Sequence, residues 1–190
     1  MNPDELLVTI SEILQELKIP HAVTGGFAVT IWGKPRYTAD IDVIIEMADK
    51  NIKPLAKKLL AIDKNVYAEE EMMREALMYH GEFNFIHSNT GLKVDFFVQD
   101  NSSYNKLKIQ RAVVRDIFSR KIPFVSPEDL ILSKLMWSKE SESQKQAEDI
   151  KSVLRNPKLN LDIPYLKNWA QKHDTIEVLE ELIERVKLEK

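Results

Sequence analysis

Cysteine is absent from all 190 residues of the chain. This absence excludes disulfide bonds, thiolate zinc sites and cysteine nucleophiles, and it is typical of a protein from a reducing compartment. No apolar run approaches the length of about 18 residues that a membrane-spanning helix needs. Residues 1–17 are acidic and helical in pattern, unlike a secretory signal. We therefore expect a cytoplasmic protein with no membrane partner.

An excess of basic residues is also lacking. The chain has 27 Lys and Arg against 30 Asp and Glu, a formal net charge of −3, which disfavours broad nucleic-acid binding. One local basic stretch is either a solvated face or an electrostatic guide for a polyanionic acceptor such as a tRNA end. Its members are Lys106, Lys108, Arg111, Arg115, Arg120 and Lys121.

Glycine is scarce, with five residues, yet Gly25 and Gly26 are adjacent, between a strand-like run and a helical one. Without a Cβ, their N–H groups can approach an anion, and a helix N-terminus adds partial positive charge. The surrounding sequence has neither the Walker A nor the GxGxxG spacing. The pair is therefore either a simple turn or a candidate phosphate cradle.

Hydrophobic periodicity predicts a mixed α/β part followed by a purely helical part. Gly33 is expected as a left-handed cap and Gly91 as a positive-φ residue of a hairpin loop. The three tryptophans are expected in the core. The predicted strands are residues 21–24, 41–46, 82–87, 92–98, 112–118 and 122–125. The predicted helices are residues 3–17, 27–32, 51–62, 69–77, 127–138, 143–154, 162–173 and 175–189.

Three carboxylates carry the candidate chemistry. Asp40 and Asp42 stand two residues apart at the start of a predicted strand, so their side chains face the same side. Asp95 lies inside an apolar strand, where an acid is costly unless it is paired or metal-bound. If the two strands are neighbours, the three carboxylates suit Mg²⁺. The alternatives are a solvated face for the first two and a buried Asp95 paired with Lys93 or Arg36.

These residues, in this order, resemble the nucleotidyltransferase-fold superfamily, which includes polymerase-beta-like enzymes. The stretch from Arg36 and Thr38 to Asp42, with the SPEDLI sequence at residues 126–131 and Lys134, resembles the AbiEii-type toxin nucleotidyltransferases and their uncharacterised relatives. The resemblance covers residues 20–155. It implies an α/β (α+β) fold with a small mixed sheet flanked by helices. A core at 1–125 and a helical region at 126–190 packed on it are expected.

The resemblance also implies roles for individual residues. Two Mg²⁺ ions would be held by the catalytic carboxylates Asp40, Asp42 and Asp95. The substrate would be a nucleoside triphosphate, ATP among the candidates. The residues expected to bind it are Gly25, Gly26, Arg36, Thr38 and Lys134.

Several of these residues have plainer alternatives. Arg36 would either bridge to Asp40 or meet the triphosphate, and Lys134 could be an ordinary surface lysine. Asp149 matches an acid of the family site, although a helix-surface acid is the plainer interpretation.

The expected reaction is transfer of a nucleoside monophosphate to a hydroxyl of an RNA end or a protein, with release of pyrophosphate. A toxin–antitoxin role would add a cognate regulatory protein as a partner. One alternative is an antibiotic-type small-molecule transferase. A second is a non-catalytic nucleotide-binding or protein-interaction scaffold of the same fold, because Phe27 stands where better-known members have serine. A third is an interaction protein whose acids never meet.

Overall fold

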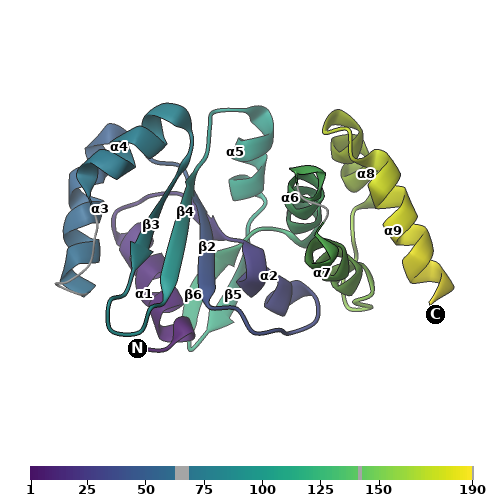
Figure 1. The fold of residues 1–190 in the computed structure, drawn as a ribbon, viewed down its shortest axis with the longest axis horizontal. Helices are drawn as coiled ribbons and strands as arrows, with labels where there is room; N and C mark the ends of the chain where they lie inside the picture. The colour runs from purple at the N-terminus through teal and green to yellow at the C-terminus, as the bar shows by residue number, and fades with distance from the viewer. Residues whose placement is uncertain (63–68, 141–142, 190) are drawn as a thin grey trace. The chain divides into compact units, whose positions relative to one another are not determined.

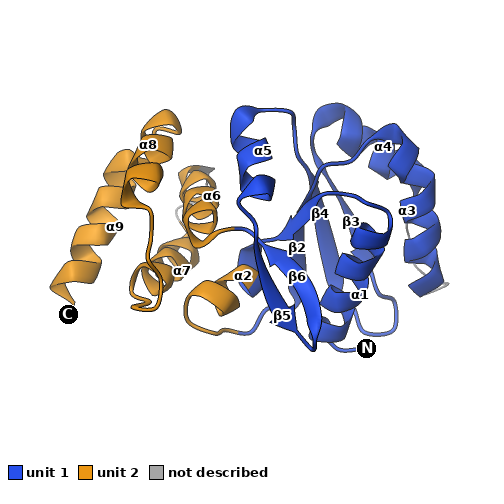
Figure 2. Ribbon diagram, turned by 180° about the vertical axis from the view of Figure 1, so that it is seen from behind, with its two compact units in different colours: residues 1–27, 37–125 blue, residues 28–36, 126–190 orange. Residues whose placement is uncertain are grey.

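The computed structural model describes residues 1–62, 69–140 and 143–189. They form two compact units: residues 1–27 with 37–125, and residues 28–36 with 126–190 (Figure 2). The second unit thus includes a short segment from the first part of the chain. Within the ranges just given, no helix is long and apolar enough to cross a membrane.

The first unit is built on six strands. All six strands predicted from the sequence are present, and each boundary differs from the prediction by two residues at most. The strands are β1 (His21–Val23), β2 (Asp40–Ile45), β3 (Glu82–Ile86), β4 (Lys93–Val98), β5 (Val113–Ile117) and β6 (Arg120–Phe124).

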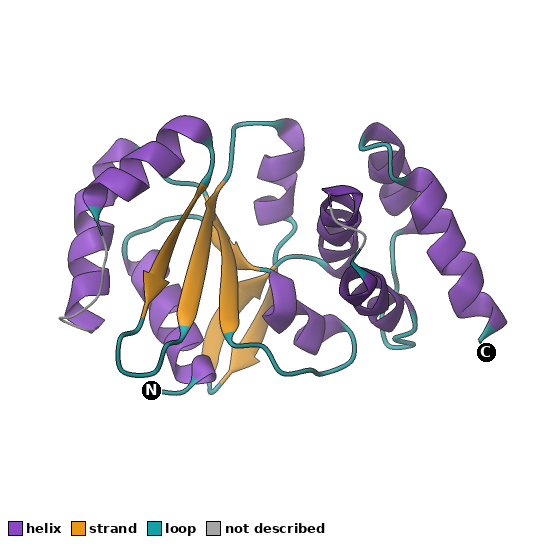
Figure 3. Ribbon diagram, in the orientation of Figure 1, coloured by secondary structure: helices purple, strands orange, loops and turns teal. Residues whose placement is uncertain are grey.

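These strands make one sheet in the order β3-β4-β2-β1-β6-β5 (Figures 1 and 3). β2 runs parallel to β4 and β1 runs parallel to β6, while the other neighbours are antiparallel. The sheet is therefore mixed and flanked by helices, which confirms the predicted α/β fold class. Gly91 has a φ of +69° in the loop between β3 and β4, as the hairpin chemistry of that loop predicts.

Helices complete the first unit. α1 begins with a reciprocal cap, in which the Asn2 side chain accepts from the Glu5 N–H and the Glu5 carboxylate accepts from the Asn2 N–H, both at 2.8 Å. The helices are α1 (Pro3–Glu16), the start of α2 (Gly25–Trp32), α3 (Asp49–Ile62), α4 (Glu70–Tyr79) and α5 (Ser103–Gln110). Only α5 was not predicted, because it has no apolar stripe and its one local signal is the Ser102 cap.

The centre of the sheet has two different faces, because successive side chains of a strand point to opposite sides. One face is apolar and buried, and on it Phe83 stacks on Phe96 with ring centroids 4.8 Å apart. The other face carries the polar residues of β2, β3 and β4. The hydrophobic face fixes the strand register, since a slip by one residue would bury the charges. The register thus sets which polar side chains are neighbours.

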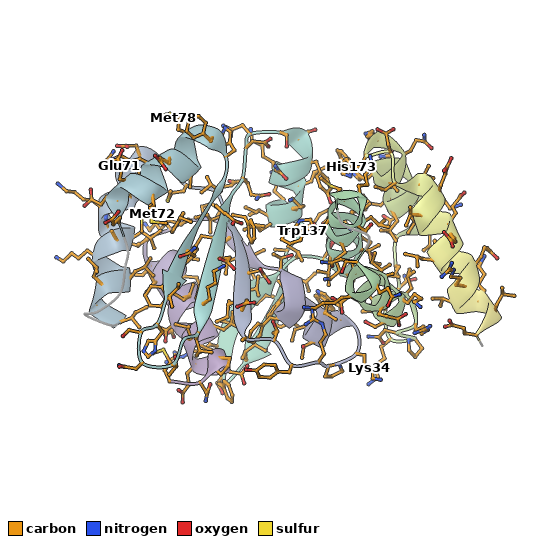
Figure 4. All side chains as sticks on the ribbon, in the orientation of Figure 1. Lys34, Glu71, Met72, Met78, Trp137 and His173 are labelled. Atoms are coloured by element: carbon orange, nitrogen blue, oxygen red, sulfur yellow. The ribbon has the colours of Figure 1, made fainter. Side chains whose placement is uncertain are left out.

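The second unit is helical and contains α6 (Pro127–Glu140), α7 (Gln144–Leu154), α8 (Ile163–Lys172) and α9 (Ile176–Leu188). Each boundary lies within two residues of the prediction. α6 packs against α7 and α8, and α9 packs against α7 and α8. Burial along α6 ends at Leu135, so the side chain of Trp137 is 53% exposed (Figure 4). The prediction that Trp137 lies in the core is wrong.

The prediction that Gly33 is a left-handed helix cap is also wrong. Its backbone is not left-handed, because the positive-φ glycines within the described ranges are Gly25 and Gly91. Its small size has another reason: a Cβ at this position would collide with the hydroxyl of Ser152 on α7. Close packing rather than helix capping therefore requires glycine here.

Candidate functional site

The candidate site of the first unit lies where β2 and β4 begin. These strands are parallel neighbours, and their register sets Asp42 opposite Asp95 and Asp40 opposite Lys93. The side chains of all four residues belong to the polar face of the sheet. Asp40 is exposed, Asp42 is half-buried and Asp95 is buried. The condition stated from the sequence, that the two acidic strands are neighbours, is met.

Gly25 brings the helix α2 onto Asp42. The N–H of Thr24, at the end of β1, donates to the Asp42 carbonyl oxygen at 2.8 Å. Gly25 follows with a φ of +58°, and a Cβ placed on it would lie only 2.5 Å from Cγ of Asp42. Both the backbone angle and the lack of space require glycine.

Gly26 has a different neighbour. A Cβ on Gly26 would lie 2.7 Å from Oγ1 of Thr38. The Thr38 hydroxyl in turn donates to the carbonyl oxygen of Asp40 at 3.2 Å. The two glycines form the first turn of α2 and not a separate turn before it. The N–H groups of a first helical turn point toward the N-terminal end, where anions bind favourably.

Lys93 lies beside these acids on the same face. Its Nζ lies 2.8 Å from Oδ1 of Asp95; the side chain of Asp95 is 12% exposed and that of Lys93 is 37% exposed. The close ion pair with Asp95 raises the pKa of Lys93, and burial, which acts the other way, is outweighed. The charges of Asp40 and Glu82 raise this pKa further. The pairing of Asp95 with Lys93, left open from the sequence, is therefore present.

The donor set fits a magnesium ion that is completed by its substrate. Across the part of the chain that the structure describes, no group of three Asp, Glu or His side chains is gathered closely enough to hold a metal alone. The register instead supplies a pair, Asp42 and Asp95, with Asp40 at the strand entrance. Mg²⁺ is usually held by one or two carboxylates together with substrate phosphates and water. The residues present are compatible with such an ion.

A second polar cluster lies inside the helical unit. Asp149 on α7 accepts two hydrogen bonds from Arg36, Nε to Oδ1 at 2.9 Å and Nη2 to Oδ2 at 3.0 Å. Nζ of Lys134 on α6 lies 2.8 Å from Asp149 Oδ2 and 2.9 Å from Oε1 of Gln146. Lys134 and Asp149 are 8% and 6% exposed, so the alternative that either is a surface residue is wrong.

The charge state of Asp149 follows from this cluster. Burial acts to raise the pKa of Asp149, but the hydrogen bonds from Arg36 and Lys134 outweigh it, and the net pKa is lowered. Asp149 is therefore an anion held between two cations.

The basic stretch is not one continuous exposed strip. Lys108 is buried, with its Nζ 5.2 Å from the ring centre of Tyr104. Nε of Arg120 lies 2.9 Å from Oε1 of Glu12. Two members of the stretch are thus engaged by neighbours, which weakens the case for an electrostatic guide along it.

Sequence reasoning did not select two residues of the polar face. Asn84 on β3 lies opposite Asp95, and Lys93 was considered only as a structural partner. Their neighbourhood depends on the pairing of three strands, which local patterns do not contain. One sequence signal could have identified Lys93: it is two residues before Asp95 on one strand, so both side chains face the same side of the sheet.

One comparison with known proteins identifies the family. A family described as "Nucleotidyltransferase of unknown function (DUF6036)" matches residues 4–188. No curated protein matches the chain.

Solved structures show the same fold. A nucleotidyltransferase-like antigen from Paracoccidioides brasiliensis matches with a TM-score of 0.55 and 20% identity, over 95% of this chain and 91% of that one. The antibiotic-resistance factor ANT(2'')-Ia matches with a TM-score of 0.60 and 15% identity, over 94% and 95%. The lincosamide antibiotic adenylyltransferase LnuA, solved with lincomycin, matches with a TM-score of 0.54 and 15% identity, over 80% and 96%. None of these three is described as a toxin.

Proposed function

Because this chain belongs to the family of nucleotidyltransferases of unknown function, we propose that it transfers a nucleoside monophosphate from a nucleoside triphosphate to a hydroxyl acceptor. One observation carries the proposal: the parallel register of β2 and β4 sets Asp42 directly beside Asp95. Two carboxylates at adjacent positions on one sheet face repel each other, and the Lys93 ammonium beside Asp95 offsets part of this repulsion. An acidic pair held in this way suits a divalent metal that is completed by substrate phosphates.

The reaction that we propose forms one bond and breaks one. The acceptor oxygen bonds to the α-phosphorus, the bond from that phosphorus to the α,β-bridging oxygen breaks, and pyrophosphate leaves. The hydroxyl proton passes to the carboxylate of Asp95. Asp40, Asp42 and Asp95 would hold Mg²⁺, which when bound neutralises triphosphate charge and polarises the α-phosphate.

The first turn of α2 supplies the phosphate cradle in this proposal. Gly25 and Gly26 let the triphosphate approach the backbone N–H groups, since a side chain at either position would intrude on Asp42 or Thr38. Thr38 is proposed to contribute its hydroxyl to the same phosphates. Arg36 and Lys134 are proposed as further nucleotide-binding residues, on the family resemblance.

The acceptor has two candidate classes. An RNA end or a protein is the first, and a toxin with a cognate regulatory protein in the cytoplasm would belong to it. A small molecule is the second, favoured by the likeness, over 80% or more of each chain, to ANT(2'')-Ia and LnuA, whose descriptions refer to antibiotics. The engaged side chains of Lys108 and Arg120 also favour the second class.

The dependence of transfer activity on ionic strength distinguishes these acceptor classes. Transfer to RNA is expected to weaken steeply as ionic strength rises, since binding a polyanion releases counterions. Transfer to a small neutral molecule is expected to change little over the same range. Transfer to RNA that is insensitive to salt would contradict the electrostatic argument.

The alternative to an enzyme is a non-catalytic scaffold. It is suggested by Phe27, which stands where better-known members have serine. The test is a thermal-unfolding scan of wild type and Asp42→Asn with each of the four nucleoside triphosphates, with and without Mg²⁺. A ligand that binds only the folded chain at about 100 times its Kd stabilises it by roughly 2.7 kcal/mol. The largest rise in the Tm of wild type is expected when Mg²⁺ and nucleotide are both present.

Asp116→Asn is the matched control, because Asp116 is an exposed aspartate on the edge strand β5. It is expected to respond like wild type, whereas Asp42→Asn is expected to lose the response. An equal rise in Asp42→Asn and wild type would refute the role of Asp42. No rise with any nucleotide in any variant would favour the scaffold.

A further inference from the structure

Lys93 holds a central position among the acids of the first unit. It lies opposite Asp40 across the β2–β4 pair and two residues before Asp95 on β4. Its Nζ is 2.8 Å from Asp95 Oδ1. Asp40 and Glu82 are close enough to stabilise its charged form. The ammonium group thus pairs with Asp95 and lies in the electrostatic field of two further acids of the polar face.

We propose that Lys93 is an internal counter-ion that competes with the divalent metal for Asp95 and so sets the metal affinity of the site. The inference rests on the proposed function, because it requires that Asp95 binds the metal. A cation that uses Asp95 must share Oδ1 with the Lys93 ammonium or displace it. Like charges at this distance repel, so binding is weaker than the carboxylates alone would give.

The structure also allows the displacement. The side chain of Lys93 is 37% exposed, and an ammonium on a flexible four-carbon stem can leave Asp95 and remain hydrated. Asp95 is 12% exposed and opposes Asp42, so it cannot turn to solvent at similar cost. Lys93 is therefore the partner that moves, and it keeps the acids charge-compensated until the metal arrives.

The test is a titration with Mn²⁺, a paramagnetic stand-in for Mg²⁺, in which electron paramagnetic resonance reports the unbound ion. Nucleotide is left out, so the readout does not depend on activity. An exposed ion pair is worth up to about 1 kcal/mol, and a partly buried pair somewhat more. Lys93→Met is therefore expected to lower the Kd for Mn²⁺ about five- to tenfold.

Three variants serve as controls. Lys50→Met removes the same charge from an exposed position at the start of α3, and it is expected to leave the Kd within about twofold of wild type. Lys93→Arg keeps the charge and is expected to behave like wild type. In an Asp95→Asn background, Lys93→Met is expected to lose its effect, because the shared carboxylate is gone.

The outcomes separate the inference from the proposed function. If wild type binds Mn²⁺ and Lys93→Met binds it no more tightly, the inference is wrong and the proposed function stands. If Lys93→Met tightens binding equally with and without Asp95, the competition is not for Asp95 and the inference is again wrong. If neither wild type nor Lys93→Met binds Mn²⁺, these carboxylates hold no metal without nucleotide and the inference is overturned, while the proposed function is still tested by the thermal scan with nucleotide. Urea denaturation without metal checks folding, and Lys93→Gln replaces Lys93→Met if the latter unfolds.

Discussion

Gly25→Ala is the substitution whose effect the structure predicts in most detail. The φ of +58° imposes a left-handed backbone, which costs a residue with a Cβ about 1–2 kcal/mol. The added Cβ would also lie 2.5 Å from Cγ of Asp42, and forcing atoms into filled space costs about 1–3 kcal/mol more. The sum is a loss of about 2–5 kcal/mol. The Asp42 carboxylate must move as well.

Gly91→Ala is the matched control. Gly91 has a similar φ of +69°, but a Cβ there would meet nothing within 4 Å. This variant therefore measures the backbone penalty alone, about 1–2 kcal/mol. The difference between the two variants isolates the collision with Asp42.

Thermal unfolding with and without Mg²⁺ and the best nucleoside triphosphate is the assay. For a chain of this size, 1 kcal/mol shifts Tm by about 2–4 °C. A loss of about 3 kcal/mol in Gly25→Ala thus lowers Tm by about 6–12 °C. Gly25→Ala is also expected to lose the nucleotide response that Gly91→Ala keeps. Equal Tm values and equal nucleotide responses in the two variants would refute the reasoning.

Two further predictions concern buried charge. Burial lowers the pKa of His21 below 6.5, although its hydrogen bond to the Ile19 carbonyl acts to raise it. Below about pH 6.5 the unfolded chain gains a proton that the folded chain does not. The free energy of unfolding therefore decreases as the pH is lowered. Urea denaturation across this range should show a smaller slope in His21→Asn, and an unchanged slope would contradict the assignment. Asp149→Asn leaves Lys134 buried without its carboxylate and should cost about 3 kcal/mol. The triple variant Arg36→Met, Lys134→Met and Asp149→Leu removes all three charges together and should cost less, as urea midpoints would show; an equal or greater loss would argue against the ion-pair cluster.

Much of the fold could be predicted from local patterns, because those patterns carry the relevant physics. The Asn2 cap marks the start of α1 in the first unit. The prolines at helix starts and the 3.6-residue apolar stripes mark the helices of the second unit closely. The α5 helix was not predicted, because its sequence SYNKLKIQ has no apolar stripe. Gly33 was misjudged because the close approach of Ser152 comes from a helix more than 100 residues away. A local pattern cannot report that contact.

The candidate site also has features that the local sequence predicts and features that it does not. The acids and the glycine pair could be selected from residue type and spacing alone. The register that sets Asp42 opposite Asp95 and Lys93 opposite Asp40 depends on strand pairing across more than 50 residues, so it required the structure. The same holds for the bidentate bonds of Arg36 to Asp149, which join residues 113 positions apart. Long-range pairing, and not residue choice, was the missing information.

The central claim is that Asp42 and Asp95 together perform nucleotidyl transfer, and one measurement tests it most directly. Wild type, Asp95→Asn and the control Asp116→Asn are each incubated with α-³²P-labelled nucleoside triphosphates, Mg²⁺ and a cell extract, and the label is followed into RNA, protein and small-molecule fractions. We predict label in one of these fractions, with release of pyrophosphate, for wild type and Asp116→Asn, and none for Asp95→Asn. Equal labelling by Asp95→Asn, or no labelling of any fraction by wild type, would contradict the account.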